Sequence, residues 1–160
     1  MSKLKIILPI LIILSLAIAG LRYWQEKNLS EEQKEIRAKR DLIKISSPDL
    51  GEEITSPLVI KGEARGGWFF EASFLVHLFD ENGEEWMIGL AEATRDWQSK
   101  SFVPFEATID WKNPAANITG EKKDPAVLFG KKGKLVFSKA NPSGLPTLDD
   151  QLTIPIVFGK

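Results

Sequence analysis

The chain lacks cysteine altogether, and its only histidine is His77. Without cysteine, the protein can form no disulfide, no cysteine-ligated zinc site, no thiol nucleophile and no lipid-modified cysteine. A Ser-His-Asp triad would have to use His77, and one histidine without carboxylates at ligand spacing makes a poor metal site. We therefore predict neither a metal nor another cofactor, and we assign His77 a structural role.

Signatures of the common enzyme classes are missing as well. The sequence has no Gly-x-Ser-x-Gly elbow, no phosphate-binding glycine loop, no His-Glu-x-x-His motif and no Asp-x-Asp-x-Asp-Gly calcium loop. A net charge of −1 over 160 residues gives no electrostatic basis for binding nucleic acid. These absences predict a protein that is not an enzyme and does not bind nucleic acid.

Charged residues are also absent from one long stretch near the N-terminus. Residues 6–21 carry no charge, two lysines precede them, and Arg22, Tyr23 and Trp24 follow. A membrane-spanning helix needs about 20 apolar residues, and the two aromatic side chains suit a membrane interface. Residues 1–24 therefore predict a single-pass membrane anchor with the C-terminal domain outside the cytoplasm. The small residues Ala17 and Ala19 leave open a signal peptide, with secretion after cleavage near Ala19.

Residues 25–41 are strongly polar. Ser30 and Gln33 form a capping-box pattern that starts a helix. Glu35 and Lys39 follow at a spacing of i,i+4, in the order that stabilises a helix. We predict a short polar helix over residues 30–40, which acts as a solvated stalk between the membrane and a domain at residues 42–160.

The domain is organised around residues 70–80, where apolar and polar side chains alternate. Phe70, Ala72, Phe74, Val76 and Leu78 fall on one face of an extended chain, which predicts a strand with that face in the core.

Turn residues separate this strand from several other short β-type runs. Asn82-Gly83, directly after the strand, is typical of a β-hairpin turn. Pro155 restricts the last run to a sheet edge or to a position outside the hydrogen-bond ladder. The runs together predict about seven strands in an all-β, immunoglobulin-like β-sandwich. The predicted strands are residues 42–45, 57–62, 70–80, 85–91, 101–111, 133–138 and 152–158.

A set of short motifs in this domain resembles a known bacterial family. The motifs are Ile45-Ser46-Ser47-Pro48, Ile54-Thr55-Ser56-Pro57-Leu58, Gly62-Glu63-Ala64-Arg65, Trp68-Phe69-Phe70-Glu71-Ala72, Asp80-Glu81-Asn82-Gly83, Trp97 before Phe102-x-x-Phe105, Asn141-Pro142-Ser143-Gly144 and Ile154-Pro155-Ile156-Val157-Phe158. Residues 42–158 resemble Gmad2, the immunoglobulin-like domain of bacterial spore-germination and related envelope proteins. The resemblance implies a β-sandwich in a secreted or membrane-attached protein, and it implies no catalytic residue.

The segment after the second predicted strand, residues 65–71, supplies the candidate contacts with a ligand or partner. Trp68 follows two glycines and could lie at the mouth of a loop beside Phe69, or it could pack as a lid on the end of the sandwich. Arg65 and Glu71 flank these aromatic residues, and they could pair with each other or bind a polar ligand.

Two functions remain open from the sequence. The first is a membrane-tethered, extracytoplasmic, non-catalytic module of a bacterial cell envelope that binds a protein or a cell-wall component. The second is a carbohydrate-binding or glycan-active protein that stacks surface tryptophans such as Trp68, Trp86 and Trp97 on sugar rings. Burial of these tryptophans in the core would remove the basis for the second.

Overall fold

The computed structural model describes residues 14–21, 23, 27, 29–113 and 124–160. The chain divides into two compact units, Met1–Lys34 and Glu35–Lys160. In the first unit, residues 14–21 are helical and exposed. The predicted anchor at residues 1–24 lies largely outside the described residues. Among those that are described, no helix is both long enough and apolar enough to cross a membrane.

Helix α2 covers Glu31–Lys39 and begins as the capping box predicts. The Ser30 amide donates to Gln33 Oε1 at 3.1 Å, and the Gln33 amide donates to Ser30 Oγ at 3.3 Å. Lys39 Nζ donates to Glu35 Oε1 at 3.3 Å, as the i,i+4 spacing predicts. The compact β unit already begins at Glu35, so the end of α2 belongs to it and not to the solvated stalk expected up to residue 41.

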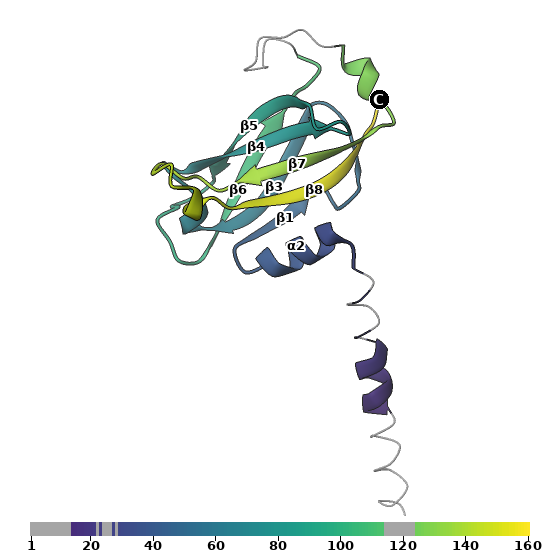
Figure 1. Cartoon of the computed structure of the whole chain (residues 1–160). Coiled ribbons are helices and arrows are strands. Elements are labelled where there is room, and N and C mark those ends of the chain that lie inside the picture. The colour runs from purple at the N-terminus through teal and green to yellow at the C-terminus, as the bar shows by residue number, and fades with distance from the viewer. Residues whose placement is uncertain (1–13, 22, 24–26, 28, 114–123) are drawn as a thin grey trace, which may run out of the picture. The chain divides into compact units, whose positions relative to one another are not determined.

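The β unit is one continuous sheet of eight strands that folds over on itself (Figure 1). The strands follow the order β1-β3-β6-β5-β4-β7-β8-β2 across the sheet. Their bounds are β1 Ile43–Ser47, β2 Glu53–Ile54, β3 Leu58–Arg65, β4 Ser73–Asp80, β5 Glu85–Ala93, β6 Phe102–Ile109, β7 Lys132–Ser138 and β8 Gln151–Phe158. Three short 3-10 helices, η1 (Gly66–Trp68), η3 (Pro125–Leu128) and η4 (Pro146–Leu148), lie in the connections.

The sheet bends where β5 meets β6. Only Glu92 and Ala93 of β5 pair with β6, opposite Glu106 and Phe105. Strands β1, β3 and β6 therefore face β5, β4, β7 and β8 across a shared core. The prediction of an all-β domain is confirmed, but eight strands form one folded sheet, whereas about seven strands in a two-sheet sandwich were predicted. Strand β2 was not predicted, because two residues are too few to show an alternation.

Aromatic rings join the two halves of the folded sheet. The Phe105 ring of β6 packs edge-on against Phe74 of β4, with 4.9 Å between ring centroids, and it packs at a tilt against Phe137 of β7 at 6.4 Å. Phe74, Val76 and Leu78 are fully buried, so the predicted alternation of β4 is confirmed over these residues. Edge-to-face aromatic pairs of this kind add about 1 kcal/mol beyond the area that they bury.

The prediction is wrong at the start of this strand. Phe70 and Ser73 exchange backbone hydrogen bonds of 3.0 and 3.1 Å around a two-residue turn, so β4 begins at Ser73. Glu71 and Ala72, at the centre of the turn, have φ angles of +49° and +65°. The tight turn takes Phe70 out of the alternating pattern, and its side chain is exposed on the surface.

Candidate functional site

The predicted contact residues Trp68 and Phe69 belong to the core. Their exposed fractions are 3% and 4%, and both rings pack against Phe74. Trp86 and Trp111 are buried as well, and Trp97 packs partly buried against the core. Trp68 and Trp86 cannot stack on a sugar ring at the surface, so the carbohydrate hypothesis retains only the partly exposed Trp97 among its named tryptophans.

Arg65 ties three segments of the domain together. Its Nε donates to the Asp41 carbonyl at 3.0 Å, and its Nη1 donates to the Lys100 carbonyl at 2.9 Å. The guanidinium also lies 4.3 Å from the centroid of the Phe102 ring. Between Arg65 and Glu71, both of which the structure describes, no ion pair forms. Arg65 therefore has a structural role, and Glu71 is the one predicted contact whose side chain is exposed.

Beside Glu71 lies a group of exposed apolar side chains, Phe70, Leu75 and Leu90, which we call the outer-face patch. Their exposed fractions are 44%, 43% and 50%. Leu75 of β4 and Leu90 of β5 are direct cross-strand partners, and all three residues line a shallow groove of about 310 Å³ together with Pro142. Contiguous exposed apolar surface of this kind is typical of interaction sites.

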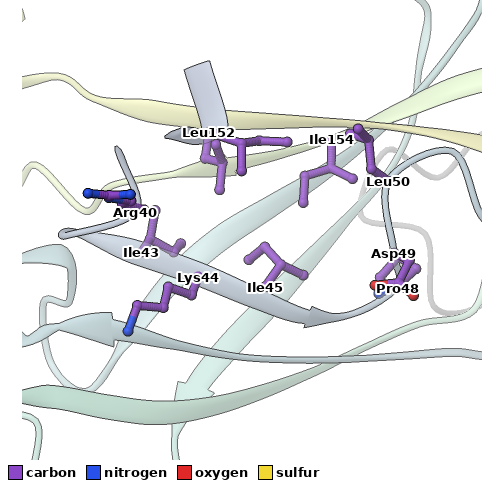
Figure 2. Close-up of a pocket in the computed structure, with 10 residues that line it drawn as sticks. Arg40, Ile43, Lys44, Ile45, Pro48, Asp49, Leu50, Leu152 and Ile154 are labelled. Carbon is purple, nitrogen blue, oxygen red and sulfur yellow. The ribbon is translucent and has the colours of Figure 1, made fainter. Parts of the chain in front are cut away.

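A second apolar opening lies between β1 and β8, where the folded sheet does not close (Figure 2). Ile43 and Ile45 of β1 lie opposite Leu152 and Ile154 of β8, and Leu50 flanks one end. The opening has a volume of about 230 Å³, and we call it the edge slot. The residues that line the edge slot are Ile36, Arg40, Ile43, Lys44, Ile45, Pro48, Asp49, Leu50, Leu152 and Ile154.

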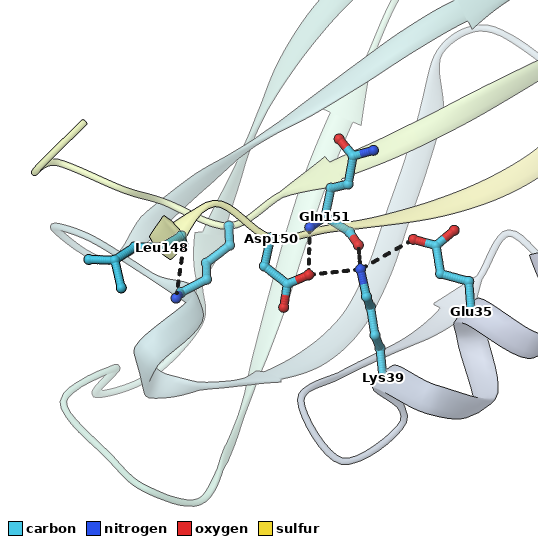
Figure 3. Close-up of polar contacts among 6 residues, drawn as sticks. Glu35, Lys39, Leu148, Asp150 and Gln151 are labelled. Carbon is cyan, nitrogen blue, oxygen red and sulfur yellow. Dashed lines mark hydrogen bonds and ion pairs between the residues drawn. The ribbon is translucent and has the colours of Figure 1, made fainter. Parts of the chain in front are cut away.

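Lys39 holds the end of α2 beside the edge slot (Figure 3). Its ammonium lies 2.7 Å from Asp150 Oδ1, donates to Glu35 Oε1 and donates to the Gln151 carbonyl. Partial burial acts to lower the pKa of Lys39, but the hydrogen bonds and negative charges of Asp150 and Glu35 outweigh it, so the pKa lies above its usual value. The charged ammonium thus fixes α2 to β8, and Ile36 and Arg40 become a wall of the slot.

A buried carboxylate organises the turn at the other end of β4. Asp80 Oδ1 accepts from the backbone amides of Asn82 and Glu84, each at 2.9 Å, and Oδ2 accepts from Trp86 Nε1 at 3.4 Å. Burial acts to raise the pKa of Asp80, but these hydrogen bonds stabilise the carboxylate more and hold the pKa below its usual value. With every oxygen engaged inside the protein, Asp80 is part of the fold.

His77 lies on the outer face of β4, near a carboxylate that the sequence did not point to. Its Nδ1 is 2.5 Å from Glu85 Oε1, and its ring stacks on Phe79 with 6.1 Å between centroids. Among the described side chains, no group of three or more His, Asp or Glu residues is placed to hold a metal ion.

Neither apolar surface was predicted, although weak indications exist. Leu75 and Phe79 fall on the second, partly covered face of β4, and an apolar residue on such a face can reveal exposed surface. The edge slot has no local sequence pattern, because it depends on which strands end up at the two edges of the sheet.

Comparison with known proteins gives one match. Residues 42–121 match the family Gmad2, described as the immunoglobulin-like domain of bacterial spore germination. No curated protein and no solved structure matches the chain. The matched residues span β1 to β6. They include the two motifs that flank β4, residues 68–72 with the turn at Glu71 and residues 80–83. The chain therefore belongs to the Gmad2 family of immunoglobulin-like domains.

Proposed function

We propose that this protein is a non-catalytic interaction module of a bacterial cell envelope, which is held at the membrane and binds a protein or cell-wall partner outside the cytoplasm. The observation that carries the proposal is the edge slot, an apolar opening at an unclosed edge of an immunoglobulin-like sheet. Exposed sheet edges bind extended partner segments by strand addition in several kinds of domain. Family membership supports an interaction role as well.

The tether is argued from the sequence. The uncharged residues 6–21, the preceding lysines and the following Tyr23 and Trp24 support a membrane anchor at residues 1–24. The test is fractionation of cells that express the full chain with a C-terminal tag. A tethered protein stays with the membranes after extraction at high pH, and external protease removes its tag. A soluble protein whose N-terminus begins near Gly20 would instead support cleavage near Ala19.

The binding role is tested by what co-purifies with the intact protein from native membranes, both for the native chain and for Leu50→Asp. Leu50 is exposed at the slot, so the substitution adds a charge there without disturbing the core. The interaction module is supported if a partner is recovered with the native chain, and if its yield is similar when the proteins are cross-linked before purification. Turnover of a cell-wall glycan by the purified protein would contradict the non-catalytic assignment.

The carbohydrate alternative keeps a direct test. Trp68 and Trp86 should contribute nothing to sedimentation with purified peptidoglycan, because both predicted stacking residues are buried. Cosedimentation that depends on exposed Phe70 or Glu71 would restore a glycan-binding role, although through different residues than the tryptophans.

A further inference from the structure

Backbone hydrogen-bonding groups face the edge slot from β1. The Leu42 carbonyl accepts from the Arg65 amide at 2.8 Å, which shows that Leu42 points its backbone groups toward β3. Backbone direction alternates along a strand, so Lys44 also faces β3, while Ile43 and Ile45 point their N–H and C=O groups away from it. In the described part of the chain, β1 has β3 as its one partner strand. The second side of β1 is thus an open strand edge.

The facing edge of β8 is occupied at both ends and open between them. Lys39 Nζ donates to the Gln151 carbonyl, and the Gly51 amide donates to the Pro155 carbonyl at 2.8 Å. Both carbonyls therefore point away from β7, and by the same alternation so do the N–H and C=O groups of Thr153. Pro155 fits this edge because the N–H that it lacks would point away from β7.

Apolar side chains and two opposite charges complete the slot. Ile45 and Leu50 offer aliphatic surface, backed by the buried Ile43 and Leu152, around about 230 Å³, which exceeds the volume of about 150 Å³ in which an apolar cavity holds benzene. Arg40 and Asp49 lie at opposite ends of the opening (Figure 2). Arg40 forms no hydrogen bond or ion pair with any residue that the structure describes.

We propose that the edge slot binds an extended peptide segment of a partner protein, which adds a strand to β1 and places aliphatic side chains between β1 and β8. The segment carries an acidic group at the end beside Arg40 and a basic group at the end beside Asp49. The backbone of Ile43 and Ile45 supplies the hydrogen bonds, the aliphatic lining supplies most of the affinity, and the two charges set the direction of the peptide. This inference rests on the proposed function and gives that function a site and a ligand class.

The test begins with a displayed library of short random peptides, selected on the intact chain in detergent micelles. Enriched peptides should alternate aliphatic residues and carry an acidic group at one end. Leu50→Asp and Arg40→Glu should each weaken binding of an enriched synthetic peptide by about tenfold or more. Matched controls are Val59→Asp, at a residue that is as exposed as Leu50 but lies on β3, and Arg95→Glu; both should stay within about twofold.

Hydrogen exchange separates strand addition from simple apolar binding. The bound peptide should slow exchange of the Ile43 and Ile45 amides, while Lys44, already paired with β3, should change little. The proposal is overturned if no peptide is enriched relative to selection on Leu50→Asp, if enriched peptides bind both slot variants normally, or if the two amides stay unprotected. A partner that co-purifies equally with native chain and Leu50→Asp would remove the slot as the site and leave the interaction module standing.

Discussion

Strand β4 begins and ends at a tight turn, and the two turns are built from very different residues. The turn after the strand has Asn82-Gly83, with Gly83 at φ +81°, and the buried Asp80 carboxylate binds its backbone amides. The turn before the strand places Glu71 and Ala72 at positive φ, a conformation that side chains with a Cβ disfavour by about 1–2 kcal/mol per residue. One turn is stabilised by its own chemistry, whereas the other is held by the packing around it.

The comparison of the two turns separates a conformation that the local residues favour from one that the surrounding core imposes. At residues 80–84 the local sequence and the final conformation agree, so this hairpin needs little help from the core. At residues 70–73 the buried rings of Phe69 and Phe74 on either side fix the path of the chain, and the turn residues accept a strained backbone. The same turn places the Phe70 side chain at the surface, within the outer-face patch.

The largest expected effect is at the well-formed turn. Asp80→Ala should lower the free energy of unfolding by about 3 kcal/mol, because the indole N–H of Trp86 and two backbone amides lose their acceptor. Urea denaturation of the purified protein measures the change. Glu81→Ala, at an exposed neighbour, serves as the control and should shift stability by less than about 0.5 kcal/mol. Equal losses in the two variants would mean that the carboxylate does not organise this turn.

Gly83→Ala comes next, with an expected loss of about 1–2 kcal/mol. A Cβ at this position meets no atom within 4 Å, so the whole effect comes from the positive φ. Gly67→Ala is a matched control, because its Cβ would also have open space and its φ lies outside the positive range. If Gly67→Ala costs as much as Gly83→Ala in the same denaturation assay, backbone strain is not the cause.

The strained turn predicts an effect of the opposite sign. Ala72→Gly should raise the free energy of unfolding by about 0.5–1 kcal/mol, since relief of the positive φ exceeds the added entropy of the unfolded chain. Ala93→Gly, within β5, should instead lower stability by a similar amount. Thermal unfolding of both variants checks the pair, and a loss of stability in Ala72→Gly would contradict the strain.

The smallest expected effect is a dependence on acid pH at the Asp80 turn. Because the folded pKa of Asp80 lies below the unfolded value of about 3.9, its stabilisation is fully present above that pH. The stabilisation is then lost as the pH falls through the folded pKa. The gap in stability between the native chain and Asp80→Asn should therefore narrow below about pH 4 in urea titrations. A gap that stays constant from pH 7 to pH 2 would show that the charge of Asp80 is not involved.

Local patterns predicted the elements that local chemistry determines. The alternation at Phe74, Val76 and Leu78, the capping box at Ser30 and the hairpin at Gly83 each appear where the residues indicate. The capping box and the hairpin depend on contacts between close neighbours in the chain, and the alternation of β4 is visible in the residue order of that one strand.

Features that depend on distant parts of the chain were not predicted. For Trp68 the sequence left a loop mouth and a packed end of the sandwich open, and its burial depends on Phe74 and the strands around it. Glu71 and Ala72 gave no sign of a turn, because neither residue favours positive φ. The edge slot follows from the order of strands across the whole sheet, and no short motif encodes that order.

The ammonium of Lys39 has a consequence for solubility. It occupies the Gln151 carbonyl on a strand edge that would otherwise be available to another molecule, and a positive charge at such a place deters stacking of sheets between copies. A shortened protein that begins at Leu42 would lose α2 and with it the contact of Lys39 with the Gln151 carbonyl. Its bare β8 edge, next to the already open β1, would make the fragment more prone than the longer chain to self-assembly into fibrils.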